Sequence, residues 1–179
     1  MKNNRTVAPR LRKFMGATAA TLLLWAALPS PGLEIGVINT WINYSGAGGG
    51  TAHGVNLLAR QEVFKYFDVG ARTGYMRSDP LGADYLPIGL SLSLKYPCFE
   101  NRFVPFVAVM GSLQFYSSDY RNSHASTPYA GFDLRFGERR QWSIYVEGLY
   151  QMGHAHLKSN DATHQFNGLG ASGGLSFRF

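Results

Sequence analysis

The sequence predicts an all-β protein, a closed up-and-down antiparallel transmembrane β-barrel of about eight strands that follows an export signal. Three observations support this fold class: a basic and then apolar N-terminal segment, a two-residue alternation of apolar and polar residues along the rest of the chain, and no sustained helical periodicity after the first segment. A length of 179 residues corresponds to one domain. We therefore treat the chain as a signal peptide plus one barrel.

The first 32 residues have the features of a secretory signal peptide. An uncharged apolar run from Met15 to Leu28 follows the basic head, and small residues and prolines follow the run. The run is shorter than the roughly 20 apolar residues that a transmembrane helix needs. We expect residues 1–32 to be cleaved, with the cut after Gly32 or a few residues away, and residues 33–179 to form the barrel. The basic head consists of Lys2, Arg5, Arg10, Arg12 and Lys13.

Removal of this leader changes the charge of the protein. The whole chain has a formal net charge of +6, and the leader holds five cations and no anions. The remaining chain has 12 Lys and Arg (17 minus 5) against 11 Asp and Glu, a net charge of about +1. A nucleic-acid partner is not expected because no basic excess remains.

The single cysteine, Cys98, excludes an internal disulfide and is expected to be a small apolar residue in a turn. No cofactor is expected.

Eight segments carry or approach the alternation expected of half-buried strands. In the clearest one, Leu86–Tyr96, the apolar side chains occupy one face and Pro, Gly, Ser and Lys occupy the other. Two segments are less regular: Ile38 and Ile42 interrupt the polar face of the first, and large residues occupy both faces of the fifth. In chain order the segments are Leu33–Tyr44, Gly54–Arg60, Val69–Met76, Leu86–Tyr96, Phe103–Tyr116, Tyr129–Phe136, Trp142–Met152 and Gly168–Phe179.

An even number of antiparallel strands can close into a barrel without unpaired edges, which lipid does not tolerate. The apolar faces would then point outward. The connections Ser117–Ser126 and Gly153–His164 are polar and longer than the others, so we expect them to be external loops that carry any recognition, with both termini on the periplasmic side. Aromatic residues are expected to form girdles at both ends: Trp41, Tyr75, Tyr96, Phe103, Phe115, Phe136, Trp142, Phe177 and Phe179.

Three stretches of this sequence resemble the small outer-membrane β-barrel families that include the OmpA-like transmembrane barrels. They are Gly-Leu-Ser-Phe-Arg-Phe at Gly174–Phe179, Phe-Asp-Val-Gly-Ala-Arg-Thr-Gly-Tyr at Phe67–Tyr75, and Val-Pro-Phe-Val at Val104–Val107. The resemblance implies a location in the cell outer membrane, with membrane lipids and lipopolysaccharide as surroundings. It also implies that Phe177 and Phe179 belong to a terminal signal read by the barrel-assembly machinery. Oligomeric state remains open.

The lumen of an eight-stranded barrel is narrow and filled by side chains, so a continuous water pore of the porin type is not expected. Ionised groups there must be paired or hydrated. We therefore expect a charge network that links Arg72 and Arg135 to Asp133 and Glu147. The alternation places these residues inward: Glu34, Arg60, Arg72, Lys95, Asp133, Arg135, Glu147, Gln151 and Arg178.

Two groups of residues resemble known kinds of site without matching them. His154 and His156 share a face and could hold a metal with His164 and Asp161, but histidine is also common in loops, and no metal site is predicted. The glycine run 46–50 lacks the lysine and the helix of a phosphate-binding loop, so we expect a flexible hairpin.

The leading hypothesis is a non-enzymatic barrel with a structural, adhesive or surface-interaction role. The first alternative is a lipid A-modifying hydrolase, because His156, Ser159 and Glu147 supply the residue types of a triad and Ser159-Asn160 resembles part of the motif of the lipid A deacylases. The spacing departs from that motif, since residues three apart point to opposite faces of a strand. The second alternative is a soluble periplasmic lipocalin-like barrel, with its apolar faces turned inward around an apolar ligand.

Overall fold

The computed structural model describes residues 32–45, 49–117, 120–159 and 163–179. The predicted signal peptide, except for its last residue, lies outside the described residues and stays a prediction. Among the described residues, no helix is long and apolar enough to cross a membrane. The elements are β1 (Leu33–Ser45), β2 (Gly50–Phe64), β3 (Phe67–Ser78), β4 (Ala83–Lys95), a short turn η1 (Phe99–Asn101), β5 (Phe103–Tyr116), β6 (Ser123–Phe136), β7 (Trp142–His156) and β8 (Thr163–Arg178).

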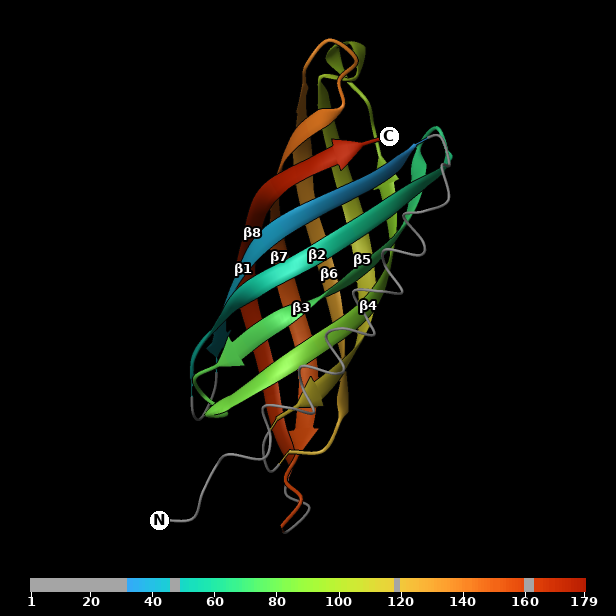
Figure 1. Cartoon of the computed structure of the whole chain (residues 1–179). Helices are drawn as coiled ribbons and strands as arrows, with labels where there is room; N and C mark the ends of the chain where they lie inside the picture. Colours follow the sequence, from blue (N-terminus) through green and yellow to red (C-terminus); the bar gives the residue numbers. More distant parts are fainter. Residues whose placement is uncertain (1–31, 46–48, 118–119, 160–162) are drawn as a thin grey trace.

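The eight strands form one closed antiparallel barrel in which each strand pairs with its neighbours in the sequence (Figure 1). Closure is made by β1 and β8, which pair from Glu34 opposite Arg178 to Ser45 opposite Asn167. Every strand therefore has a partner on both sides, as lipid requires. The predicted fold class is confirmed.

The strands are 12 to 16 residues long, whereas about 9–11 residues are enough for one tilted strand to cross a bilayer. We call the end that holds Leu33 and Arg178 the terminal end, and the opposite end, where β7 connects to β8, the far end. In Figure 1 the terminal end is at the top, with η1 and the turn between β6 and β7.

The predicted bounds of the two long loops are wrong. β6 begins at Ser123, β7 continues to His156 and β8 begins at Thr163, so the connections are residues 117–122 and 157–162. Connections at the terminal end, such as 96–102, are of similar length. The loops were predicted too long because strand ends that extend past the hydrocarbon carry polar residues on both faces. That composition is also typical of a loop.

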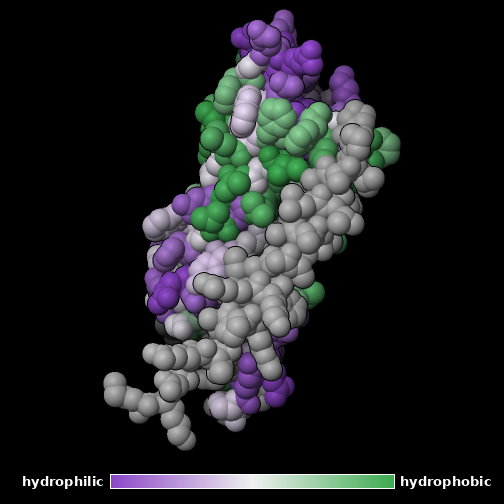
Figure 2. Space-filling model, viewed as in Figure 1, coloured by the Kyte–Doolittle hydropathy of each residue, from purple (hydrophilic) through white to green (hydrophobic). Residues whose placement is uncertain are grey.

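The outer wall of the barrel is apolar, as predicted. Leu90, Leu92 and Leu175 are 69%, 50% and 53% exposed, and the serines that alternate with them are buried in the lumen. On the face shown in Figure 2, hydrophobic residues form a band with hydrophilic residues above and below it. The soluble-barrel alternative needed these leucines to point inward, so it does not fit the structure.

Glycines on the inner face leave room for the lumen side chains. A Cβ atom on Gly131 would overlap the carbonyl oxygen of Val146 and approach the backbone of Glu147 on the neighbouring strand. Gly74 is confined in the same way by Val55 and Asn56. Glycine thus lets the strands curve tightly around a lumen that is already full.

A charge on the outer wall should destabilise the barrel according to its depth. We expect Leu90→Arg, in the middle of β4, to lower the free energy of unfolding in lipid vesicles by about 2–4 kcal/mol, because arginine is costly at the bilayer centre. Leu94→Arg is the matched control near the terminal end of the same strand, with an expected loss of about 0–1 kcal/mol. Urea titration of vesicle-bound protein measures both. Equal losses would contradict the proposed depth of β4.

Candidate functional site: the barrel lumen and its mouths

The lumen is charged in its terminal half and largely apolar in its far half. Among the described residues the charges balance: five acidic and five basic side chains project inward, and most are buried. A narrow interior can hold so many ions only as pairs, because each isolated ion would lose its hydration without compensation. The ten residues are Glu34, Glu62, Asp68, Asp133, Glu147, Arg60, Arg72, Lys95, Arg135 and Arg178.

Arg60 is the centre of the first charge cluster. Its Nη2 atom donates to Glu34 Oε1 at 2.5 Å and to both carboxylate oxygens of Asp133 at 3.0 and 2.9 Å. Ser176 also donates to Glu34. Because Glu34 is on β1, Arg60 on β2 and Asp133 on β6, this cluster connects opposite sides of the barrel wall.

A second cluster joins Arg72 on β3 to Glu147 on β7. The guanidinium makes two hydrogen bonds to the carboxylate, at 2.7 and 3.0 Å, a geometry that gives strong charge-assisted pairing. Tyr145 contacts both clusters: its hydroxyl donates to Glu147 and accepts from Arg72, and its ring lies 5.0 Å from the guanidinium carbon of Arg60. The two clusters are therefore neighbours in the lumen.

The predicted network was incomplete. The structure brings Arg72 to Glu147, as the sequence suggested, and places Arg135 3.8 Å from Asp133. The closest partner of Asp133 is Arg60, which the sequence placed inward without assigning it a role. Alternation predicts which residues face the lumen, but only the register of all eight strands shows which of them are at the same height.

A third cluster lies toward the rim of the terminal end. Lys95 Nζ donates to Asp68 at 2.6 Å and to Glu62 at 2.7 Å, and Arg178 donates to Glu62 as well. The first of these contacts is buried, whereas Glu62 is partly exposed. Glu62 thus neutralises two cations at the edge of the solvent.

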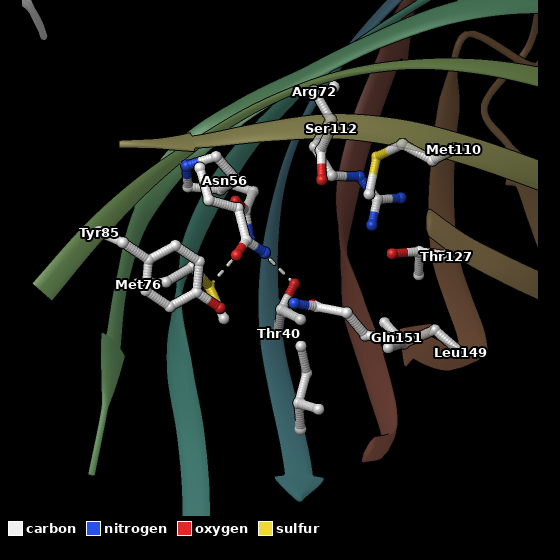
Figure 3. Close-up of a pocket in the computed structure, with 14 residues that line it drawn as sticks. Thr40, Asn56, Arg72, Met76, Tyr85, Met110, Ser112, Thr127, Leu149 and Gln151 are labelled. Atoms are coloured by element: carbon white, nitrogen blue, oxygen red, sulfur yellow. Dashed lines mark hydrogen bonds between the residues drawn. The ribbon is translucent and has the colours of Figure 1, made fainter. Parts of the chain in front are cut away.

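The middle of the lumen contains a small cavity of about 30 Å³, lined mainly by polar side chains and methionines (Figure 3). Asn56 donates to the hydroxyl of Thr40 at 2.9 Å and lies 3.5 Å from the sulfur of Met76. Such a volume suits one or two water molecules. Side chains from opposite walls, including Arg72 and Gln151, converge on this space.

Aromatic and aliphatic side chains fill much of the far half. Tyr85 is nearly fully buried, with its hydroxyl 3.4 Å from that of Tyr44 and its ring 5.4 Å from that of Tyr116. Ile38 and Ile42, which interrupt the polar pattern of β1, belong to the same buried cluster. The two residues that break the alternation of β1 thus belong to an apolar cluster to which the regular strands, such as β4 with Tyr85, also contribute.

No protein-family model matches the sequence, and no curated protein matches it. Several solved structures match the fold. Neisserial surface protein A aligns over 82% of this chain and 97% of its own, with 9% identity and a TM-score of 0.61. This chain is a small transmembrane β-barrel of the outer-membrane type.

Two further small barrels support the assignment. The outer membrane protein OprG from Pseudomonas aeruginosa covers 83% of this chain and 96% of its own, with 13% identity and a TM-score of 0.57. The outer membrane protein AlkL covers 84% and 91%, with 18% identity and a TM-score of 0.53. At these identities the shared property is the fold, which agrees with the predicted OmpA-like class of barrel.

The residues of the hydrolase alternative are not brought together in this outer-membrane-type barrel. Glu147 points into the lumen and pairs with Arg72, whereas His156 lies on the opposite face of the same strand. His156 Nδ1 is 3.1 Å from the hydroxyl of Thr163. Ser159 is exposed in the connection between β7 and β8.

Three histidines gather on the outer face at the far end. The ring of His154 lies 5.1 Å from that of His156 and 4.4 Å from that of His124. His124 belongs to the neighbouring strand β6, and the sequence did not predict that it would join the other two. Among the described residues, no group of three or more His, Cys, Asp or Glu side chains is arranged to hold a metal. Asp161 lies outside the described residues, as does the side chain of His164.

Phe177 and Phe179, the predicted assembly signal, lie on the outer wall at the terminal end. The ring of Phe177 packs edge-on against Trp142 at 4.9 Å and against Phe179 at 5.0 Å. Phe179 remains well exposed. The two rings and Trp142 form part of the aromatic girdle at this end.

The lumen ion pairs can be tested by removal of one or both partners. We expect Glu147→Leu to lower the free energy of unfolding by about 3–5 kcal/mol, because Arg72 is left as an uncompensated buried charge. The double variant Arg72→Met/Glu147→Leu should lose clearly less, since no ion remains unpaired. Urea unfolding in detergent micelles measures both.

Asp84→Asn at the exposed Arg77–Asp84 contact (3.7 Å) is the control, with an expected change of about 0–1 kcal/mol. A double variant as unstable as Glu147→Leu alone would contradict the role assigned to the pair.

Proposed function

We propose that this protein is a non-catalytic barrel of the cell outer membrane that does not conduct and that presents its far end outside the cell in a structural or adhesive role. The observation that supports this proposal is the filled lumen. Three ion-pair clusters occupy the terminal half, and buried aromatic side chains occupy the far half. A barrel filled in this way acts through its outer wall and its ends.

The far end offers a polar surface on strands that are long enough to rise above the hydrocarbon. Arg77, Asp79 and His124 are exposed there. Trp41 stacks on His53, the register partner of Arg77, with ring centres 5.4 Å apart. Tryptophan is typical of the membrane interface. A partner outside the cell would meet this polar rim, and the histidines on β6 and β7 would be among its contacts.

The surroundings follow from the same proposal. Outer-membrane lipids and lipopolysaccharide would cover the apolar band, and the barrel-assembly machinery would read Phe177 and Phe179 on the outer wall. Neisserial surface protein A, which shares the fold, is a surface protein by name. A surface role for this chain agrees with that name and with the exposed far end.

Epitope insertion tests which end faces outward. A short tag inserted after Lys158, in the connection between β7 and β8, should bind antibody on intact cells, because exposed loop tips tolerate insertions. The matched tag after Glu138, in the turn between β6 and β7, should bind only after the outer membrane is permeabilised. Labelling of the Glu138 tag on intact cells would overturn the orientation and with it the surface role.

Current measurements in planar lipid bilayers test the filled lumen. Purified protein should leave the current at baseline under applied voltage, because ion pairs and aromatic rings occupy the path through the barrel. A porin added to the same membrane serves as the positive control. Reproducible current steps from this protein would show that the lumen opens, and the non-conducting role would then be wrong.

A further inference from the structure

A hollow of about 610 Å³ opens at the terminal mouth of the barrel, and its lining is strongly basic. Four arginines line it: Arg135 at the end of β6, Arg139 and Arg140 in the following turn, and Arg178 at the end of β8. Glu138 is the acidic side chain of the lining. The walls of this hollow therefore carry an excess of positive charge.

Arg135 is the buried member of the group. Its side chain is 5% exposed, and its ion pair with Asp133 is long, at 3.8 Å. Both oxygens of Asp133 already accept hydrogen bonds from Arg60. The Nε atom of Arg135 is buried without a hydrogen-bond partner among the described residues. A buried guanidinium has five N–H donors to satisfy, so Arg135 is poised for an acceptor that enters from the mouth.

The other arginines are only partly neutralised. Arg178 shares the carboxylate of Glu62 with Lys95. Arg140 pairs at 2.9 Å with Glu100, whose side chain is 77% exposed, so solvent weakens the attraction. Arg139 is exposed at the edge of the hollow. Each of them can add a donor to an anion that Arg135 holds.

We propose that this hollow, the mouth site, binds a phosphate-bearing anion. A phosphate group offers several acceptor oxygens and up to two negative charges, which match convergent guanidinium groups better than a single carboxylate does. The volume exceeds that of a lone phosphate ion, so a phosphate ester fits. The mouth site goes beyond the surface role proposed above, because it lies at the opposite end of the barrel.

Two sources could supply this chemistry. Trp142 and Phe136 are exposed on the outer wall directly beside the turn that carries Arg139 and Arg140, at the height where lipid headgroups are expected. A phospholipid headgroup could therefore fold over the rim into the mouth site. A soluble phosphate ester in the aqueous space could enter the same site along the barrel axis.

Calorimetry on the whole protein in a nonionic detergent tests the mouth site with inorganic phosphate and glycerol phosphate as probes. We expect both to bind, and Arg135→Gln to weaken binding about tenfold or more, since one hydrogen bond to a charged group contributes about 1.5–3 kcal/mol. Nanodiscs of phosphatidylcholine with and without phosphatidylglycerol form the second arm, with retained lipid measured by native mass spectrometry. Retention of phosphatidylglycerol that is lost in Arg135→Gln identifies the headgroup as the source, and binding of the soluble probes alone identifies the soluble ester.

Arg77→Gln, at an exposed arginine of the far end, is the matched control and should bind as the wild type does. Arg139→Gln is a second variant at an exposed position, so the test does not depend on the folding of Arg135→Gln; we expect it to weaken phosphate binding severalfold. The proposal is overturned if neither probe nor anionic lipid binds, if acetate binds as tightly as phosphate, or if the mouth variants bind as well as Arg77→Gln does.

Discussion

The pairing of β1 with β8 is the constraint on which the rest of this structure depends. In hydrocarbon every backbone N–H and C=O must find a partner within the protein, so an open sheet edge is not tolerated. Closure fixes the inward or outward direction of each residue, since neighbouring positions alternate. The apolar band and the filled lumen both follow from that fixed alternation.

Charge balance is the second requirement that closure imposes. Once Glu34, Arg60 and Asp133 are enclosed together, each must be satisfied by the others, because water in the lumen is scarce. The clusters connect strands that are far apart around the wall, which resists collapse or shear of a narrow cylinder. Arg135 is the exception to this pairing of enclosed charges, because its ion pair is long and its buried Nε atom has no hydrogen-bond partner among the described residues. It lies where the lumen opens.

The two halves of the lumen explain why some strands were easy to recognise and others were not. From Gly89 to Lys95, the inner face of strand β4 carries only glycine, serine and lysine, so the alternation there is clean. Strand β1 supplies Ile38 and Ile42 to the far apolar cluster, so its two faces look alike in the sequence. The lengths of the far-end loops were overestimated for a similar reason, because strand residues beyond the hydrocarbon are polar on the outer face as well as on the inner face.

The sequence by itself determined the class of fold, the number of strands and most of the inward ionisable residues, because a period of two depends only on local backbone geometry. It did not identify Glu62 and Asp68, the acidic residues of the third cluster. The tertiary structure alone decided which inward residues meet. Several contacts form only because strands distant in the chain lie at matching heights. They are the pairing of Arg60 with Asp133, the position of Tyr145 between two arginines, the contact of His124 with His154, and the four arginines around one hollow. Those heights are set by strand register and barrel closure. Register and closure are properties of the whole barrel and not of any one segment.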